Sequence, residues 1–451
     1  MNELLSAGDA SAPALIDADR GVTVTYAELR ERVADAARRL DSETGPGLAF
    51  LRVTNTVQGI VAYLAGLAAG RPLALLDAAL PEPMLATLVE TYRPAAVAGP
   101  EGVVARPGTA PPVHPDLALL LTTSGSTGNP KLVRLTARNL LANASSIVRY
   151  LDLAPGERAM LSLPLQYSYG LSVLNSHLLA GAAVVLSGHS FMRPEFWQAL
   201  DGTAATSFAG VPYAWETLHR LRFDPARHPT LRTMTQAGGA LRPELVRAFH
   251  ERASAAGRRF FVMYGQTEAT ARIAYVPPER LADKIGSIGI AIPDGELSLQ
   301  PVDGGDQSEL VYRGPNVMMG YAHGAGDLAD GDRLDGVLRT GDLACVDEDG
   351  YFRITGRLAR FAKLFGRRVS LEDVERELER QFPLQAAAVE DGERLLLHVA
   401  PTGDAAVSDA LPLLRHLATW LAVPPTALRV QAHARLPMTA SGKKDYQALR
   451  T

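Results

Sequence analysis

The chain has 451 residues, of which 47% are hydrophobic and 21% charged, with a formal net charge of −4; the length suits a large domain with a smaller one, and the charge argues against general nucleic-acid binding. A single cysteine, Cys345, excludes an internal disulfide framework and is typical of a reducing compartment. Because it has no run of ~20 apolar residues and no basic-flanked leader, the sequence predicts a cytoplasmic protein without a membrane span.

Helical and strand patterns alternate along the chain. Residues 23–40 predict an amphipathic helix capped by a threonine, because apolar residues recur there at helical spacing. Short β-rich runs follow, of which the clearest are 117–121, 182–186, 259–263 and 309–312. This alternation predicts an α/β architecture with mainly parallel sheets.

The strand at 117–121 leads into a loop that is rich in hydroxyl groups and glycine and ends at Lys131. Backbone N–H groups, hydroxyls and a lysine together can bind a polyphosphate, and glycine permits close approach. The loop does not fit a Walker motif, because Leu132 follows the lysine, and a plain surface turn is the alternative by composition. We expect ATP to bind here, through Thr123, Ser124, Gly125, Ser126, Thr127, Gly128 and Lys131.

This loop and the motifs that follow it resemble those of the acyl- and aryl-adenylate-forming enzymes, the superfamily of acyl-CoA synthetases, nonribosomal-peptide adenylation domains and firefly-type luciferases. The later motifs stand in the family's order: Tyr264 to Glu268, Gly314 to Tyr321, Arg339 to Asp342, Gly356-Arg357 with Gly366 to Val369 and Glu375, and Pro437 to Lys443. The resemblance implies a large N-terminal domain of several subdomains at 1–357 and a small, mobile α+β domain at 358–451. The part before residue 117 is short for this family.

The resemblance also implies roles around ATP. Glu268 would bind Mg²⁺, and Thr267 would contact the α-phosphate. Tyr264 and Gly265 would lie against adenine, with Gly238 and Gly239 on its opposite side. Asp342 would accept hydrogen bonds from the ribose hydroxyls, assisted by Arg357.

Lys443 is the expected catalytic cation. A positive charge between the acid's carboxylate and the α-phosphate neutralises the repulsion between two anions and stabilises the pentavalent phosphorus. We expect the neighbouring Lys444 to face solvent. Many relatives have an acidic residue at the hinge between domains, and this chain has Ala359 there.

The segment 163–172 resembles the family's acyl-binding segment. Members that activate amino acids have an aspartate there, and the matching position is Gly170, so an α-amino acid is disfavoured because its ammonium would have no partner. The expected pocket is apolar with hydroxyl edges, and simple core packing is the alternative for its last three members: Tyr167, Tyr169, Gly170, Phe208, Val211 and Tyr213. An aryl or a short or medium aliphatic acid would fit.

The acceptor of the acyl group is a thiol in this family. Gly366 matches the glycine that lets a pantetheine arm approach, and a basic patch surrounds it, formed by Arg360, Lys363, Arg367 and Arg368. Such a patch suits the phosphates of coenzyme A or the acidic helix of a carrier protein, and a solvated basic face is the alternative.

The predicted function is therefore ATP-dependent activation of a carboxylic acid with release of pyrophosphate, followed by transfer to coenzyme A or a carrier-protein phosphopantetheine. A non-catalytic nucleotide-binding relative and an amino-acid-adenylating enzyme are the alternatives.

Overall fold

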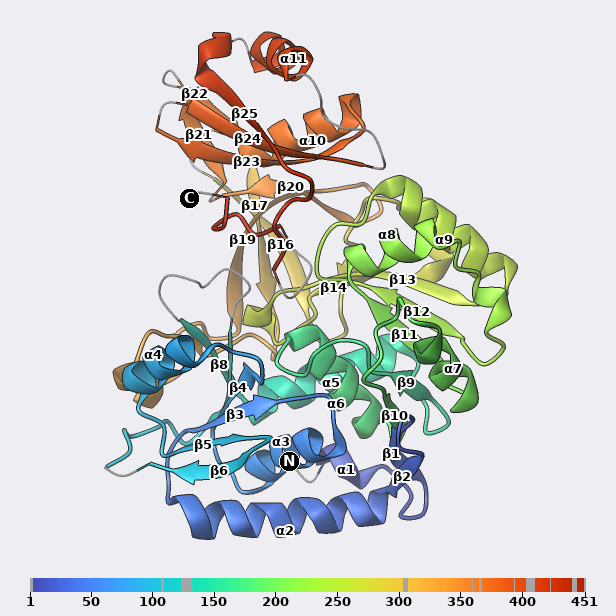
Figure 1. The fold of residues 1–451 in the computed structure, drawn as a ribbon, viewed down its shortest axis with the longest axis vertical. Coiled ribbons are helices and arrows are strands. Elements are labelled where there is room, and N and C mark those ends of the chain that lie inside the picture. The colour runs from blue at the N-terminus through green and yellow to red at the C-terminus, as the bar shows by residue number, and fades with distance from the viewer. Residues whose placement is uncertain are drawn as a thin grey trace. The chain divides into compact units, whose positions relative to one another are not determined.

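The computed structural model describes residues 3–106, 109–122, 131–302, 307–358, 360–364, 367–392, 394–402, 410–421, 423–439 and 444–449 (Figure 1). These residues form two compact units. The first contains Met1–Leu297 and Tyr312–Leu338, and the second contains Ser298–Val311 and Arg339–Thr451.

A nine-stranded sheet forms one half of the first unit in the described part of the chain. Its strands from β13 to β1 run parallel, and antiparallel strands flank them. In spatial order the strands are β15 (Ile290–Ala291), β14 (Ala274–Val276), β13 (Arg259–Tyr264), β12 (Thr233–Gln236), β11 (Ser207–Gly210), β9 (Arg158–Met160), β10 (Ala183–Leu186), β1 (Pro13–Asp17) and β2 (Val22–Thr25).

The second large sheet has seven described strands, of which β7, β4, β3 and β5 are parallel. In spatial order they are β18 (Gly320–Ala322), β8 (Leu132–Thr136), β7 (Leu117–Thr122), β4 (Leu73–Asp77), β3 (Ala49–Val53), β5 (Ala96–Gly99) and β6 (Gly102–Ala105). The predicted α/β class with mainly parallel sheets is thus confirmed. The strands expected at 117–121, 182–186, 259–263 and 309–312 also form, each within one residue at either end.

Helices of the first unit cover both sheets (Figure 1). They are α1 (Glu3–Ser6), α2 (Tyr26–Thr44), α3 (Val57–Ala68), α4 (Glu82–Tyr92), α5 (Ala137–Leu151), α6 (Ser168–Leu179), α7 (Pro194–Gly202), α8 (Pro212–Arg220) and α9 (Pro243–Ala255), with short 3₁₀ turns η1 (Pro225–Arg227), η2 (Thr267–Ala269), η3 (Pro278–Arg280) and η4 (Ala325–Ala329). One continuous core joins residues of the two sheets to α5 and α6, among them Leu121, Val184, Ile147 and Leu174.

The threonine-capped helix forms as α2, although it begins later than expected. The Thr25 hydroxyl accepts from the Glu28 N–H, and the Glu28 carboxylate accepts from the Thr25 N–H, which is a reciprocal capping box. Thr23 and Val24, with which we expected the helix to begin, belong instead to strand β2. The helix therefore starts at Tyr26 and runs on to Thr44.

Helix α6 is buried along its length from Ser168 to Leu178. A helix that is buried on all sides needs internal partners for its polar groups. Asn175 donates to the Tyr63 hydroxyl at 3.0 Å, and the Ser172 hydroxyl donates to the Tyr169 carbonyl at 2.7 Å. The helix is thereby fixed in the centre of the unit, with its N-terminus directly after Tyr167.

The second unit contains most residues of three small sheets and two described helices. The sheets are β16 (Glu296–Pro301), β17 (Ser308–Arg313), β19 (Val337–Val346) and β20 (Phe352–Arg357); β21 (Phe361–Leu364) with β22 (Arg367–Ser370); and β23 (Leu384–Asp391), β24 (Arg394–Pro401) and β25 (Leu428–Ala432). The helices are α10 (Leu371–Gln381) and α11 (Leu411–Leu421), with a 3₁₀ turn η5 (Pro425–Ala427). A separate apolar core joins α10 and α11 to the last sheet.

Candidate active site

The predicted site residues of the first unit follow the carboxyl ends of neighbouring parallel strands. Strands β9, β11, β12 and β13 lie side by side in register, with Met160 opposite Phe208, and Gln236 opposite both Gly210 and Val262. The segments that leave these ends carry the motifs, because parallel strands deliver their following loops to one edge of a sheet. They contain Tyr167 and Ser168, Val211, Gly238 and Gly239, and Tyr264 to Glu268.

Glu268 and Lys131 meet at a third residue, Tyr321. The Tyr321 hydroxyl donates to Glu268 Oε1 at 2.7 Å, and Lys131 Nζ lies 3.8 Å from the centroid of the Tyr321 ring. Burial and the adjacent Glu268 charge both raise the pKa of Tyr321, so the phenol keeps its proton. Lys131 and the predicted magnesium ligand Glu268 thus both contact Tyr321 on strand β18, which pairs with β8.

Thr267 lies beside the start of α6. Its hydroxyl and that of Ser168 are 3.3 Å apart. Thr267, which we expect at the α-phosphate, and Ser168, the first residue of the buried helix α6, therefore lie next to each other. Neither Ser168 nor Tyr321 was predicted from the sequence as a site residue, although both stand inside the motifs named above.

The glycine pair at 238 and 239 packs against the aromatic side of the site. Gly238 has a φ of +88°, and a Cβ there would lie 2.5 Å from the Tyr167 hydroxyl oxygen and 3.2 Å from Val211 Cγ1. A side chain at 238 would therefore displace Tyr167. The Gly239 carbonyl accepts from Gln236 at 2.7 Å, which fixes the turn. Tyr264 accepts at its hydroxyl from Gln266 at 3.1 Å.

Position 170 does not face the site, and our interpretation of Gly170 was wrong in this respect. A Cβ at Gly170 would lie 2.2 Å from the Pro164 carbonyl oxygen and 2.7 Å from that of Leu163. No side chain fits against backbone at such distances. The glycine allows α6 to pack closely on 163–164, and a side chain at this position would collide with that backbone.

Tyr167 and Tyr169 form an edge-to-face pair, with ring centroids 6.2 Å apart. Tyr169 is buried, and its hydroxyl bonds to Thr235 at 2.8 Å. Phe208 instead belongs to the aromatic core between the nine-stranded sheet and α7 and α8, where it packs edge-to-face on Phe196 and Trp215. The simple-core alternative thus describes Phe208 well.

Tyr213 stands on the exposed side of α8. Its side chain is 38% exposed, and its ring packs edge-on against Phe191. Val211 is buried and is the N-cap residue of α8. Of the expected pocket residues, Tyr167, Tyr169 and Val211 therefore group with Gly238 and the neighbouring strand ends.

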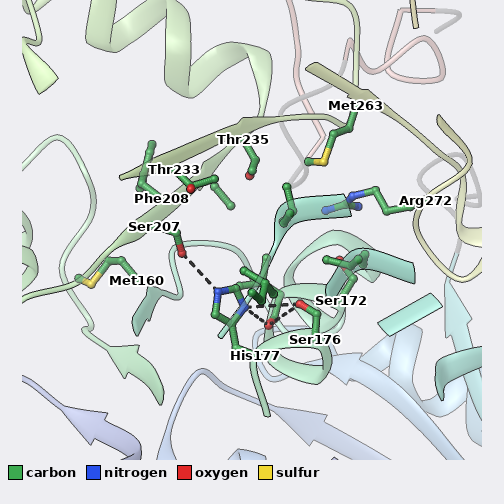
Figure 2. Close-up of a pocket in the computed structure, with 15 residues that line it drawn as sticks. Met160, Ser172, Ser176, His177, Ser207, Phe208, Thr233, Thr235, Met263 and Arg272 are labelled. Carbon is green, nitrogen blue, oxygen red and sulfur yellow. Dashed lines mark hydrogen bonds between the residues drawn. The ribbon is translucent and has the colours of Figure 1, made fainter. Parts of the chain in front are cut away.

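A small cavity of about 20 Å³ lies between α5, α6 and the sheet (Figure 2), which leaves room for about one water molecule. His177 lines it. Nδ1 must donate to the Val173 carbonyl at 2.9 Å, so Nε2 accepts from the Ser207 hydroxyl at 3.4 Å. Burial lowers the pKa of His177 to about 4, and the imidazole is neutral. Arg272, which we did not identify from the sequence, lines the same cavity.

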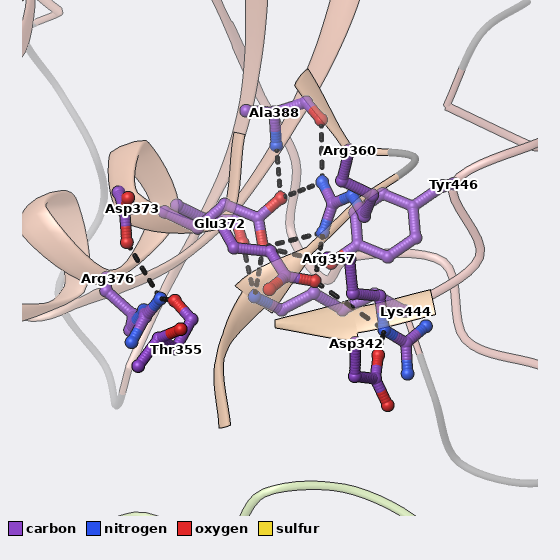
Figure 3. A network of polar contacts seen from close by, with 12 residues as sticks. Asp342, Thr355, Arg357, Arg360, Glu372, Asp373, Arg376, Ala388, Lys444 and Tyr446 are labelled. Carbon is purple, nitrogen blue, oxygen red and sulfur yellow. Dashed lines mark hydrogen bonds and ion pairs between the residues drawn. The ribbon is translucent and has the colours of Figure 1, made fainter. Parts of the chain in front are cut away.

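In the second unit, Asp342 and Arg357 form an ion pair of 2.7 Å between β19 and β20 (Figure 3). The register of the two strands places the residues directly opposite each other. Asp342 is 2% exposed, whereas the Arg357 side chain is half exposed. Arg357 also lies 3.8 Å from Glu372, whose pKa is raised by burial. The two residues expected at the ribose are therefore neighbours in the fold.

Lys444 and Arg360 both take part in a polar network around Glu375, contrary to our expectation for both. Arg360 Nη2 lies 2.5 Å from Glu375 Oε1, and Lys444 Nζ lies 3.3 Å from Glu375 Oε2 and 2.9 Å from Glu379 (Figure 3). Tyr446 donates to Glu375 at 2.9 Å. Burial opposes the Glu375 charge, but the Lys444 ammonium and the Arg360 guanidinium outweigh it and lower the Glu375 pKa. Arg360 thus belongs to a structural network and not to a surface patch.

Several predicted residues lie outside the described part of the chain: Thr123, Ser124, Gly125, Ser126, Thr127, Gly128, Ala359, Gly366 and Lys443. Arg367 and Arg368 are described as backbone in β22.

The described residues could bind a magnesium ion only together with the phosphates of a bound nucleotide. Within them no group of three or more histidine, cysteine or acidic side chains could hold a metal. Mg²⁺ characteristically binds one or two carboxylates together with water and phosphate oxygens. Glu268 fits that role, since among the described contacts the Tyr321 hydroxyl occupies Oε1 alone. No described helix has the length and apolar character needed to cross a bilayer.

Comparison with known proteins identifies the family of the chain. The family model described as AMP-binding enzyme matches residues 6–322. A feruloyl-CoA synthase from an Amycolatopsis species is 32% identical over 406 residues, which cover 82% of this chain and 80% of the relative.

Two solved structures share the fold over the whole chain. The o-succinylbenzoate CoA synthetase of Bacillus subtilis, bound to its acyl-adenylate intermediate, superposes with a TM-score of 0.81 at 22% identity and is covered to 98%. ATP-bound MatB from Rhodopseudomonas palustris superposes with a TM-score of 0.82 at 23% identity and is also covered to 98%. The chain belongs to the AMP-binding enzymes, the acyl- and aryl-adenylate-forming superfamily, and is an ATP-dependent, AMP-forming acid–thiol ligase.

Proposed function

We propose that this ligase adenylates a carboxylic acid that has no α-amino group and transfers the acyl group to coenzyme A. The observation that carries the proposal is the assembly of Lys131, Tyr321, Glu268, Thr267 and Ser168, which come from four separate segments and meet at one edge of the fold. Binding a triphosphate together with its metal ion requires a cation, a carboxylate and hydroxyl groups close to one another.

In the first half-reaction a carboxylate oxygen of the acid attacks the α-phosphorus of ATP. The new P–O bond forms as the bond to the β-phosphate oxygen breaks, and pyrophosphate leaves. Lys131 would attract the outer phosphates, Thr267 would donate to the α-phosphate, and Tyr321 would orient the Glu268 carboxylate. A bound Mg²⁺ would neutralise phosphate charge as pyrophosphate departs.

We assign Lys443 to the same half-reaction, as the cation between the carboxylate and the α-phosphate. Asp342 would accept from the ribose hydroxyls, and its ion pair with Arg357 orients the carboxylate for that role. Tyr264 with Gly265, opposite Gly238 and Gly239, would bind adenine.

In the second half-reaction the thiolate sulfur of coenzyme A attacks the acyl carbon, and AMP leaves with the electron pair of the mixed anhydride. We propose that residues 358–451 rotate between the two steps about position 359, as in the family. Gly366 would then give the pantetheine arm access, and Arg367 and Arg368 would attract the phosphates. The CoA-linked activity in the relative's name supports coenzyme A over a carrier protein.

The preference against α-amino acids no longer depends on Gly170. It is supported by the charge of Arg272, which lies with its Cζ 4.0 Å from the Tyr169 ring centroid, next to the pocket residue Tyr167. A positively charged ammonium near this guanidinium would be repelled.

ATP–pyrophosphate exchange with a panel of acids and their α-amino analogues tests the first step. We expect exchange with acids, exchange weaker by ~10²-fold with matched amino acids, and AMP release that requires coenzyme A. Exchange that is faster with amino acids, or acyl transfer only to a phosphopantetheinylated carrier protein, would contradict the acid and the acceptor assignments respectively.

A further inference from the structure

The turn that carries Thr267 and Glu268 contains a residue with a strained backbone. Thr270 has a φ of +65° and a ψ of −34°, and it is 5% exposed. A β-branched residue rarely adopts a positive φ, because its side chain then crowds its own backbone. Such a conformation persists only where the surrounding structure enforces it, and residues of this kind cluster at active sites.

The turn around Thr270 is tight. The Thr270 N–H closes the 3₁₀ turn η2 by donating to the Thr267 carbonyl at 2.9 Å. The chain then passes so close to its start that a Cβ at Gly265 would lie 1.7 Å from the Ala271 carbonyl oxygen. The backbone angles of Thr270 therefore determine how η2 is oriented after strand β13.

Asn316 holds this turn from a segment distant in sequence. Its Nδ2 donates to the Ala269 carbonyl at 2.8 Å and to the Arg272 carbonyl at 2.9 Å, one on each side of Thr270. The backbone carbonyl of Asn316 accepts from the Thr270 hydroxyl at 2.6 Å. One residue is thus bonded to both ends and to the middle of the strained segment.

The amide of Asn316 is itself fixed. It is buried, with 1% of the residue exposed, and its Oδ1 accepts from the Tyr312 hydroxyl at 2.7 Å. The two backbone carbonyls that it contacts can only accept, so they determine which side-chain atom is the nitrogen. A Cβ at Gly314 would lie 2.8 Å from Asn316 Oδ1, so this glycine leaves room for the amide. A buried amide that is bonded on all sides resists reorientation.

The segment that contains Asn316 also bonds to Glu268. The Met318 N–H donates to the Glu268 carbonyl at 2.9 Å, and the Tyr321 hydroxyl donates to the Glu268 carboxylate. Residues 316–321 therefore contact both the backbone of the turn and its acidic side chain. Within this segment, Asn316 is the residue that spans the strained position.

We propose that Asn316 is a positioning residue for the adenylation step. It holds Thr270 in its strained conformation and so keeps the Thr267 hydroxyl and the Glu268 carboxylate in place for the phosphates of ATP. The inference rests on the proposed function and deepens it, since it concerns the same site. An uncharged, buried amide supplies no charge to the reaction and acts through the residues that it orients. Its loss should affect the nucleotide and not the acid.

Asn316→Ser tests this role, because a serine side chain is too short to reach both carbonyls. In ATP–pyrophosphate exchange we expect kcat to fall by on the order of 10²-fold and the KM for ATP to rise by ~10-fold. The KM for the acid should stay close to the wild-type value. Calorimetric titration with ATP, with and without Mg²⁺, measures the same effect without turnover, and the Kd should rise by ~10-fold.

Thr270→Gly separates the effect of strain from a general loss of packing. Glycine adopts a positive φ without penalty, so in the Asn316→Ser background the turn no longer needs the lost bonds to keep its conformation. We expect the double variant to recover ~10-fold of the lost kcat, the effect that relief of one strained residue can have. If Asn316 only stabilised the fold, the second change would add to the first and lower the rate further.

Thr270→Val keeps the inference testable if Asn316→Ser does not fold. The change retains the size and branching of the side chain and removes the hydroxyl that bonds to the Asn316 carbonyl. It should raise the KM for ATP in the same direction by a smaller factor. An unchanged KM for ATP in Thr270→Val would contradict the inference.

Asn175→Ser is the matched control. Asn175 is also buried and its amide also bonds to a tyrosine hydroxyl, that of Tyr63, but it lies on α6. It should lower the melting temperature and leave the KM for ATP unchanged. A wild-type KM and Kd for ATP in Asn316→Ser, or a double variant slower than Asn316→Ser, would overturn the inference and leave the ligase assignment intact. Absence of exchange with every acid in the wild type would instead refute the proposed function.

Discussion

The hydroxyl of Tyr321 donates a 2.7 Å hydrogen bond to the carboxylate of Glu268, 53 residues away in sequence. The same tyrosine presents its ring to the Lys131 ammonium. One side chain therefore joins the expected metal ligand to the lysine of the predicted phosphate loop. Tyr321 lies on strand β18, a short strand at the edge of the seven-stranded sheet that pairs with β8.

Tyr321→Phe should keep the ring and lose the bond to Glu268. The carboxylate would then be less well oriented, and we expect the Mg²⁺ concentration for half-maximal pyrophosphate exchange to rise by ~10-fold. A magnesium titration of exchange rates measures this. The control is Tyr63→Phe, which also removes a buried hydroxyl, here one bonded to Asn175. Identical magnesium curves for wild type and Tyr321→Phe would argue against the assigned role.

The elements and motifs of this chain were predictable because they depend on local pattern. The run 117–121 is apolar and short, and it forms β7; the order of Thr, Glu and apolar residues near 25 forms the cap of α2. The order of the motifs along the chain likewise predicts one nucleotide site that contains Lys131, Thr267 and Glu268.

The direction of individual side chains was not predictable. Gly170 was assigned to a pocket by its place in a motif, but its Cα faces backbone carbonyls because α6 packs tightly on 163–164. From its place beside Lys443 in the sequence, Lys444 was expected to be a solvent-facing charge. Its contact with Glu375 depends on the packing of residues 384–391 beside α10. Arg272 gave no signal of its own, since burial of a charged residue depends on neighbours distant in sequence.

Lys443→Ala tests the division of labour between the two half-reactions. Loss of one preorganised charge should reduce adenylate formation by on the order of 10²-fold or more. Thioester formation from a supplied acyl-adenylate should change little, because the lysine is assigned to the first step alone. Single-turnover assays of each step measure both rates. Equal losses in the two steps would contradict the assignment.

Lys444→Met should act on stability and not on a single chemical step. The change removes the ammonium group that pairs with Glu379 and Glu375. Among the described contacts, Arg360 then remains as the cation beside Glu375. We expect the free energy of unfolding of the second unit to fall by about 2 kcal/mol, less than for a fully buried pair because Lys444 is partly exposed. Denaturant unfolding measures it. Arg429→Met, which breaks an exposed 3.9 Å pair with Asp391, should cost little, and equal stabilities of the two variants would refute the prediction.

Charge reversal at Arg367 and Arg368 addresses the acceptor. If these residues attract coenzyme A phosphates, the double change to glutamate should raise the KM for coenzyme A by ~10-fold at low salt and less at high salt. Pyrophosphate exchange should stay intact. Arg415→Glu, on the exposed side of α11, is the control for altered charge in the same unit. Unchanged kinetics with coenzyme A would remove these two residues from the acceptor site.

His177 should make the first unit less stable in mild acid. Its folded pKa is about 4, lowered by burial from 6.5, so the unfolded chain binds a proton over a range in which the folded chain does not. The stability it contributes is full above pH 6.5 and is lost as the pH falls towards 4. Relative to pH 8, the loss at pH 5 is about 2 kcal/mol.

Denaturant unfolding at pH 8 and at pH 5 measures this loss, above the range in which most carboxylates titrate. His177→Gln keeps a polar group of similar size and cannot be protonated, so the difference between the two pH values should shrink by most of that amount. His189→Asn changes an exposed histidine that lies 3.7 Å from Asp19, and it should keep the wild-type pH dependence. If His177→Gln shows the same loss between pH 8 and pH 5 as the wild type, the acid sensitivity originates elsewhere in the unit, and the buried imidazole is not its source.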